Sequence, residues 1–206
     1  LSPAERQRAA AFRSGEAARL FVAGRLLCRS VLAGVIGCAP EDLGIALSLV
    51  GRPYLPAHPE IDFNLSHTAD RVALAICRNG RVGIDIERLE AHAEAAMQDL
   101  IPLVLSEAEE AGLRHLPPPE RPAAFLALWV SKEAILKCRS RGLLDDPRGV
   151  PIESAHATNN LCERSDNLGD RRRLHRGNDG GYLWAVATEE PIESPVWRHH
   201  STSTVS

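Results

Sequence analysis

The chain has 206 residues, of which 44% are hydrophobic and 25% are charged, and 24 basic against 27 acidic side chains give a formal net charge of −3. This composition excludes collagen-like, coiled-coil and wholly disordered chains, and the charge favours neither a nucleic-acid-binding protein nor an acidic tail. The longest apolar stretches are shorter than the ~20 residues that a membrane helix needs, and charged residues interrupt any signal-peptide pattern at the start. We therefore expect a cytoplasmic protein without membrane contact.

The five cysteines are widely spaced and form no C-x-x-C pair. This spacing predicts neither a disulfide framework nor a structural zinc site.

Two helices are predicted at the start of the chain. The segment 2–5 reads Ser-Pro-Ala-Glu, a capping box with proline at the first helical position. Apolar residues spaced by three and four predict a long second helix over 16–36. Gly37 and Pro40 are expected to end it.

After residue 40 the apolar pattern changes to a period of two, which is typical of strands. Residues 45–49 alternate in this way, and a turn is predicted at 51–53, Gly-Arg-Pro. Further short strands are predicted over 61–65 and 72–77.

A hairpin is predicted at Asn79-Gly80, a favoured pair for a tight turn between strands. The strand that follows, 82–87, has apolar residues on one face and Asp85 and Glu87 on the other. Strands before and after this turn also suggest two similar α+β halves that are joined here.

The second half of the sequence again mixes helices and strands. A capping box at 106–109 predicts a short helix, which prolines 117–119 should end, and a long apolar helix is predicted over 121–138. Residues 182–188 form a strong strand candidate.

Two stretches of the second half read as irregular structure. The polar region 159–181 is predicted to be a loop with at most one weak strand, and its basic run 171–173 lies beside acidic residues and indicates a solvated loop or an edge strand. The residues after Trp197 are expected to be a disordered tail.

Asp85 and Glu87 are the first candidate site residues. On a strand their side chains leave the same face, with Cα atoms ~7 Å apart, and two such carboxylates can bind a hard divalent cation. The alternative is that they lie on the solvent face of an antiparallel strand.

The helix over 121–138 supplies a third carboxylate. Glu133 and Lys137 are four residues apart and share a face, with Cβ atoms ~6 Å apart. Such a pair is most often an exposed salt bridge, but Trp129 on the same face and the apolar remainder of the helix also fit a pair that faces an interior cleft. The sequence leaves both interpretations open.

The segment 63–68, Phe-Asn-Leu-Ser-His-Thr, ends a predicted strand in hydrogen-bonding side chains. Ser66 and His67 could bind an anion such as phosphate, and Arg52 at the preceding turn adds a positive charge. The alternative is a capped turn that contains a structural histidine.

Taken in order, these segments resemble the Sfp-type 4′-phosphopantetheinyl transferases. The segments are Gly51-Arg52-Pro53, 63–67, 82–87 and 129–137. They correspond to the family's G-K-P, F-N-x-S-H, V-G-I-D-I-E and W-x-x-K-E-A-x-x-K patterns, with Arg52 where the family often has lysine. Each motif alone is weak, but their order and spacing together are specific.

The resemblance implies an α+β fold of two pseudo-symmetric subdomains, 1–79 and 80–197, with the active site in the cleft between them and a tail at 198–206. It implies transfer of the phosphopantetheine group from coenzyme A to a serine of an apo acyl or peptidyl carrier protein, with release of adenosine 3′,5′-bisphosphate. The expected cofactor is Mg²⁺, and the expected partners are coenzyme A and the carrier protein. We expect a monomer that binds no nucleic acid.

The resemblance also assigns roles to individual residues. Mg²⁺ would be held by Asp85, Glu87 and Glu133. The nucleotide and pyrophosphate would meet Arg52, Ser66, His67 and Lys132. The catalytic residues would be Glu133 and Lys137, either of which could take the proton of the serine.

Two other functions fit the same residues. Several carboxylates and a lysine could also form a metal-dependent phosphodiesterase or nuclease. The chain could instead bind coenzyme A without catalysing any reaction.

Overall fold

The computed structural model describes residues 1–68, 70–91, 94–140, 145–152, 162–165 and 171–189. The chain separates into two compact units, of which the first contains Leu1–Leu43 and the second contains Gly44–Pro191. Each unit is described by itself.

The first unit is helical. Helix α1 spans Pro3–Ala10 and begins with the predicted capping box, and helix α2 spans Gly15–Ile36. Gly37 ends α2 in the left-handed conformation at φ 85°, which glycine adopts without steric cost. Arg29 of α2 forms an ion pair with Glu5 of α1 at 2.8 Å, and this contact joins the two helices.

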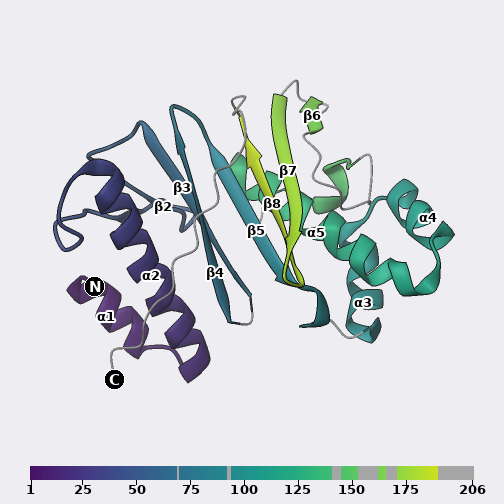
Figure 1. Cartoon of the computed structure of the whole chain (residues 1–206), viewed down its shortest axis with the longest axis horizontal. Helices are drawn as coiled ribbons and strands as arrows, with labels where there is room; N and C mark the ends of the chain where they lie inside the picture. The colour runs from purple at the N-terminus through teal and green to yellow at the C-terminus, as the bar shows by residue number, and fades with distance from the viewer. Residues whose placement is uncertain (69, 92–93, 141–144, 153–161, 166–170, 190–206) are drawn as a thin grey trace. The chain divides into compact units, whose positions relative to one another are not determined.

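The described strands of the second unit form antiparallel sheets (Figure 1). The strands are β1 (Ala46–Leu47), β2 (Pro53–Tyr54), β3 (Ile61–Thr68), β4 (Arg71–Arg78), β5 (Val82–Arg88), β6 (Cys162–Ser165), β7 (Arg171–Asp179) and β8 (Tyr182–Thr188). Strands β1 and β2 pair, β3 and β4 pair, and the largest sheet has the order β5-β8-β7-β6. Together with the helices, these sheets confirm the predicted α+β class.

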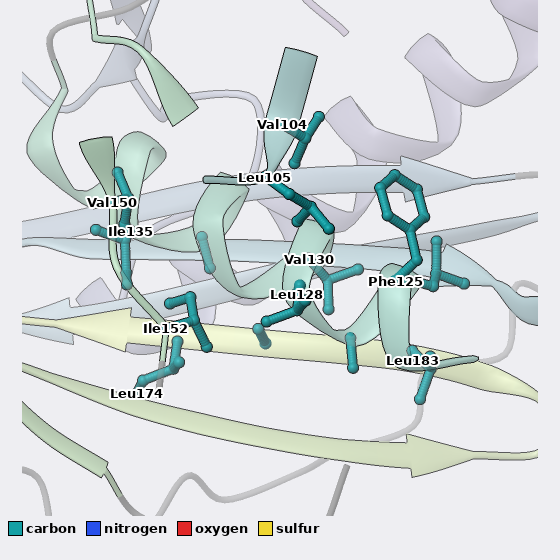
Figure 2. Packing of buried hydrophobic residues seen from close by; sticks show 14 of the residues in the cluster. Val104, Leu105, Phe125, Leu128, Val130, Ile135, Val150, Ile152, Leu174 and Leu183 are labelled. Atoms are coloured by element: carbon teal, nitrogen blue, oxygen red, sulfur yellow. The ribbon is translucent and has the colours of Figure 1, made fainter. Parts of the chain in front are cut away.

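Helix α5 covers one face of the largest sheet, where it contacts β5, β8 and β7. The helices of this unit are α3 (Glu94–Val104), α4 (Glu107–His115) and α5 (Arg121–Arg139), with single turns at Leu89–Ala91, Pro118–Glu120 and Pro147–Gly149. Figure 2 shows the core that α5 forms with its neighbours, which includes Phe125, Leu128, Val130, Leu174 and Leu183. Burial of such side chains contributes ~1.5–3 kcal/mol each, so α5 is firmly held.

The predicted apolar face of 82–87 is confirmed. Val82 and Ile84 of β5 pack with Cys77 of β4 and Val186 of β8. The opposite face of β5, which carries Asp85, is turned toward α5.

One prediction about this region is wrong. Asn79 does make a turn, with φ 58°, but β5 pairs with β8 and, among the described strands, β4 pairs only with β3. The Asn-Gly turn therefore joins two sheets rather than the strands of a hairpin. A tight turn fixes the local direction of the chain, but the backbone groups of β5 have a better partner in β8, with which seven residues are in register.

The prediction that 159–181 is a loop with at most one weak strand is also wrong. Strand β7 occupies Arg171–Asp179 and pairs with both β6 and β8. Because this strand contains long basic side chains, its sequence shows no apolar alternation that would predict a strand. Leu174 and Arg176 are nevertheless both buried. The stems of such side chains can cover apolar surface.

The predicted tail 198–206 lies outside the described residues. The predicted boundary between two subdomains, at residues 79 and 80, stays a prediction.

Candidate functional site

The site begins with an unusual contact between two strands. The edge of β5 that does not pair with β8 faces the polar side chains of β3. Val82 N donates to Asp62 Oδ2 at 2.8 Å, Ile84 N to Asn64 Oδ1 at 2.9 Å, and Ile86 N to Ser66 Oγ at 3.4 Å. We call Asp62, Asn64, Ser66 and Thr68 the polar row of β3. This row satisfies backbone donors of β5 that would otherwise be buried without a partner.

Asp85 lies at the centre of the site and is 3% exposed. Its Oδ1 accepts hydrogen bonds from Ser66 Oγ at 2.7 Å and from Lys137 Nζ at 2.5 Å. Burial raises the pKa of this carboxyl, and the charge and hydrogen bond of Lys137 oppose that rise. The structure therefore excludes the interpretation that Asp85 lies on a solvent face.

Glu133 and Lys137 project from the same side of α5, as predicted. Lys137 pairs with Asp85 rather than standing exposed on the helix surface. Burial raises the pKa of Glu133, the charge of Lys137 lowers it, and the charges of Asp85 and Glu87 raise it further. Three carboxylates thus lie close enough to influence one another, and a single lysine moderates their repulsion.

Arg52 joins several of the elements that form the site. Its guanidinium pairs with Asp62 at 2.5 Å and donates to the backbone carbonyls of Val82 and Lys137 at 2.7 and 2.5 Å. Arg52, in the turn before β2, thereby connects β3, β5 and the last turn of α5, where the helix carbonyls favour a cation. In this geometry Arg52 holds these elements together. Its contact with a phosphate stays a prediction.

Lys132 is fully buried on another side of α5. Its Nζ contacts Glu109 Oε2 at 2.7 Å and the carbonyl oxygen of Pro147 at 2.9 Å. Burial lowers the pKa of Lys132, and the hydrogen bond and charge of Glu109 oppose that change. These contacts tie α5 to α4 and to the turn at 147–149, and the predicted role at the pyrophosphate stays a prediction.

His67 is exposed on β3. It lies on the face of the strand opposite to Ser66 and Thr68, because side chains alternate along a strand. The structure thus brings Ser66, Asp85, Glu133 and Lys137 together, and it separates His67 and Lys132 from that group.

The donor chemistry around Asp85 fits a hard divalent cation. Asp85 Oδ2 is buried and, within the described residues, has no hydrogen-bond partner. Carboxylate oxygens are the ligands that Mg²⁺ prefers. No group of three or more His, Cys, Asp or Glu side chains in the described part of the chain is already arranged as a metal site. The metal therefore belongs to the proposal below.

Sequence reasoning assigned no role in the site to Asp62, Thr68 and Glu109. Thr68 Oγ1 donates to Glu87 Oε2 at 2.7 Å, and Glu109 holds the buried amine of Lys132. For Thr68 a signal was present, because polar residues at 62, 64, 66 and 68 alternate with period two through the whole strand.

Buried carboxylates that hold a divalent cation, with a lysine beside them, can stabilise negative charge on a phosphorylated substrate. The chain belongs to the 4′-phosphopantetheinyl transferase superfamily, whose family model matches residues 81–187. A second model, described as the N-terminal part of 4′-phosphopantetheinyl transferase, matches residues 1–79. The first match contains all three candidate metal ligands.

Curated relatives agree with this family. A 4′-phosphopantetheinyl transferase from Bacillus subtilis is 28% identical over 75% of this chain and 64% of that protein. The 4′-phosphopantetheinyl transferase HetI from Nostoc is 32% identical over 69% of this chain and 61% of that protein. The L-aminoadipate-semialdehyde dehydrogenase-phosphopantetheinyl transferase of Schizosaccharomyces pombe is 28% identical over 100% of this chain and 81% of that protein.

The chain thus spans less than two thirds of the length of the first two relatives. Among the described residues, no helix has the length and apolar character to cross a membrane.

Proposed function

We propose that the protein transfers the 4′-phosphopantetheine group of coenzyme A to a serine hydroxyl of an apo acyl or peptidyl carrier protein. This proposal is based mainly on the proximity of Asp85 of β5 to Lys137 and Glu133 of α5. Membership of the superfamily supports the same reaction.

The proposed reaction exchanges one phosphorus–oxygen bond for another. The serine oxygen attacks the phosphorus that carries the pantetheine arm, and a new oxygen–phosphorus bond forms. The bond to the bridging oxygen of the pyrophosphate breaks, and adenosine 3′,5′-bisphosphate leaves with the electron pair. The serine proton must pass to a base, since the neutral hydroxyl is a weak nucleophile.

Glu133 is the better candidate for this base. The amine of Lys137 is already engaged in an ion pair with Asp85 at 2.5 Å. The pKa of Glu133 is raised, with burial as the largest cause, so this carboxylate attracts a proton more strongly than an ordinary glutamate. Lys137 would then provide positive charge near the pyrophosphate.

Asp85, Glu87 and Glu133 would hold Mg²⁺. When bound there, the cation would neutralise charge that develops on the pyrophosphate oxygens. Of the four residues predicted to contact the nucleotide, His67 is the exposed one. Arg52, Ser66 and Lys132 already bind protein groups, so His67 is the first to test for a contact with the nucleotide.

The partners and location of the protein follow the same proposal. Coenzyme A would be the donor substrate, an apo carrier protein the acceptor, and the cytoplasm the compartment. We propose a monomer that uses neither nucleic acid nor a membrane.

The test is incubation with coenzyme A, Mg²⁺ and a panel of apo acyl and peptidyl carrier proteins, followed by intact-protein mass spectrometry. The expected result is a mass gain of one phosphopantetheine on the carrier, and its loss when EDTA removes the metal. A matched carrier with the acceptor serine changed to alanine should stay unmodified.

The competing functions give different results in the same assay. Cleavage of DNA or of a phosphodiester without modification of any carrier would favour a nuclease. Binding of coenzyme A without either reaction would favour a non-catalytic module. Both outcomes would contradict the proposal.

A further inference from the structure

We propose that Thr68 is a positioning residue that orients Glu87 for binding of the divalent cation. The inference rests on the proposed function, because that function assigns Glu87 to the metal. Neither the sequence motifs nor the resemblance gives Thr68 a role.

The hydrogen bond between Thr68 and Glu87 is short and partly buried. Thr68 is 8% exposed at the end of β3, and its Oγ1 donates to Glu87 Oε2 at 2.7 Å. Glu87 is only half-buried, and this hydrogen bond restricts the rotamers that its side chain can adopt. A hydrogen bond from a neighbour that is itself buried fixes one carboxylate oxygen in space.

A second pair of residues has the same geometry, two residues earlier on each strand. Ser66 Oγ donates to Asp85 Oδ1 at 2.7 Å. The two hydroxyl residues are two apart on β3, and the two carboxylates are two apart on β5, so both strands present their side chains with the same period. The polar row of β3 therefore ends in two hydroxyls that each hold one carboxylate of β5.

The two earlier members of the polar row, Asp62 and Asn64, accept hydrogen bonds from backbone N–H groups of β5. Ser66 has both roles, because its hydroxyl also accepts a hydrogen bond from Ile86 N at 3.4 Å. The row thus passes from support of the main chain to orientation of carboxylates, and the two roles overlap at Ser66.

Residues that donate hydrogen bonds to metal-binding carboxylates affect metal affinity, because they orient the carboxylate before the metal binds. Loss of such a partner typically costs 10–100-fold in metal affinity or activity. We therefore expect removal of the Thr68 hydroxyl to weaken the response to the cation, with a smaller effect on the fold.

The test compares three variants of the full chain. Thr68→Val removes the hydroxyl and keeps the shape, and Thr68→Ser keeps the hydroxyl and removes the methyl group. Asn64→Leu removes a member of the polar row that accepts a hydrogen bond from the main chain of β5. Binding of Mn²⁺ is measured by isothermal titration calorimetry and by electron paramagnetic resonance. The Mg²⁺ dependence of carrier modification and the thermal midpoint are measured on the same samples.

We expect Thr68→Val to weaken Mn²⁺ binding, and to raise the Mg²⁺ concentration for half-maximal rate, by about 10-fold or more. Thr68→Ser should stay within about 3-fold of the wild type. Asn64→Leu should lower the thermal midpoint at least as much as Thr68→Val, while its folded fraction keeps the wild-type affinity for Mn²⁺.

Wild-type affinity for Mn²⁺ in folded Thr68→Val would overturn the inference, and so would equal weakening in Asn64→Leu. Failure of the proposed function looks different, because the wild type itself would then modify no carrier. The Mn²⁺ measurements on the variants do not depend on that activity.

Discussion

Gly83 of β5 and Ala134 of α5 approach so closely that no side chain fits between them. A Cβ atom at Gly83 would lie 2.0 Å from the carbonyl oxygen of Ala134 and 2.4 Å from the backbone nitrogen of Cys138. Real Cβ atoms do not reach such distances from backbone atoms. This contact fixes how near α5 lies to β5, and thereby how near Lys137 lies to Asp85.

Gly83→Ala is therefore expected to push α5 away from the sheet. Overpacking of a core typically costs 1–3 kcal/mol and occasionally more, so we expect the free energy of unfolding to fall by at least about 2 kcal/mol. Transfer activity should fall at least about 10-fold in the fraction that stays folded, because the ion pair with Asp85 lengthens. Urea denaturation and the carrier assay measure the two effects.

Gly112→Ala is the matched control. Gly112 lies within α4, where an added Cβ meets no atom within 4 Å, and alanine favours a helix by ~1 kcal/mol relative to glycine. Stability should rise slightly and activity should not change. If both variants behaved alike, the close approach at Gly83 would not limit the position of α5.

Glu133→Gln should abolish transfer and leave the fold intact. The glutamine keeps the shape of the side chain but cannot accept the serine proton, and a general base typically contributes 10²–10⁴-fold to the rate. The thermal midpoint should stay the same or rise, because the burial and like-charge repulsion that raise the pKa of Glu133 disappear with its charge. Glu107→Gln on the exposed face of α4 is the control. Activity within about 10-fold of the wild type would remove Glu133 from its role as base.

Lys132→Met should destabilise the protein strongly. Lys132 and Glu109 have side chains that are 1% and 8% exposed, and removal of one partner of such a pair costs ~3–5 kcal/mol because the other charge stays buried. The double variant Lys132→Met with Glu109→Gln should recover part of this loss. Urea denaturation of the four combinations measures the coupling.

The same variants separate the two roles of Lys132. A residue that ties α5 to α4 lowers stability when it is lost, while the KM for coenzyme A in the folded fraction stays close to that of the wild type. A raised KM without a loss of stability would instead support the pyrophosphate contact that the resemblance implies.

His175 of β7 should make stability depend on pH. It is buried, and its Nε2 has no hydrogen-bond partner in the described part of the chain. Burial, and then the charge of Arg173, lower the pKa of His175 from its ordinary 6.5. The unfolded chain therefore binds a proton that the folded chain resists, and stability falls as the pH drops from about 6.5 toward the lowered pKa.

The measurement is the urea midpoint between pH 7.5 and 5.5 for the wild type and for His175→Gln, which does not titrate in this range. The wild type should lose more stability than the variant over this interval. Parallel pH profiles would show that His175 does not contribute.

The helices and several strands could be predicted because their signals are local. The capping boxes at 2–5 and 106–109 mark the starts of α1 and α4. The helices predicted over 16–36 and 121–138 each differ from α2 and α5 by one residue at one end. Strand 182–188 was likewise predicted with its observed ends. The sequence signals for these elements lie within a few residues of one another, although β8 itself pairs with the distant β5.

Strand pairing could not be predicted in the same way. Nothing near Asn79 indicates that β5 prefers β8, which lies a hundred residues further along the chain. Of the site, the motifs predicted Asp85, Glu133 and Lys137, which the structure brings together. They did not predict that Arg52 and Lys132 would be buried in ion pairs with Asp62 and Glu109, because those partners come from other elements.

The polar row of β3 also bears on how the protein avoids association. An open edge of a sheet presents unpaired N–H groups that a strand of another molecule can use. On β5 these donors are covered by side chains of β3, which can satisfy them but cannot continue the sheet as a further strand. The edge beside the site is thereby closed to strand addition, and its protection depends on polar residues at every second position of β3.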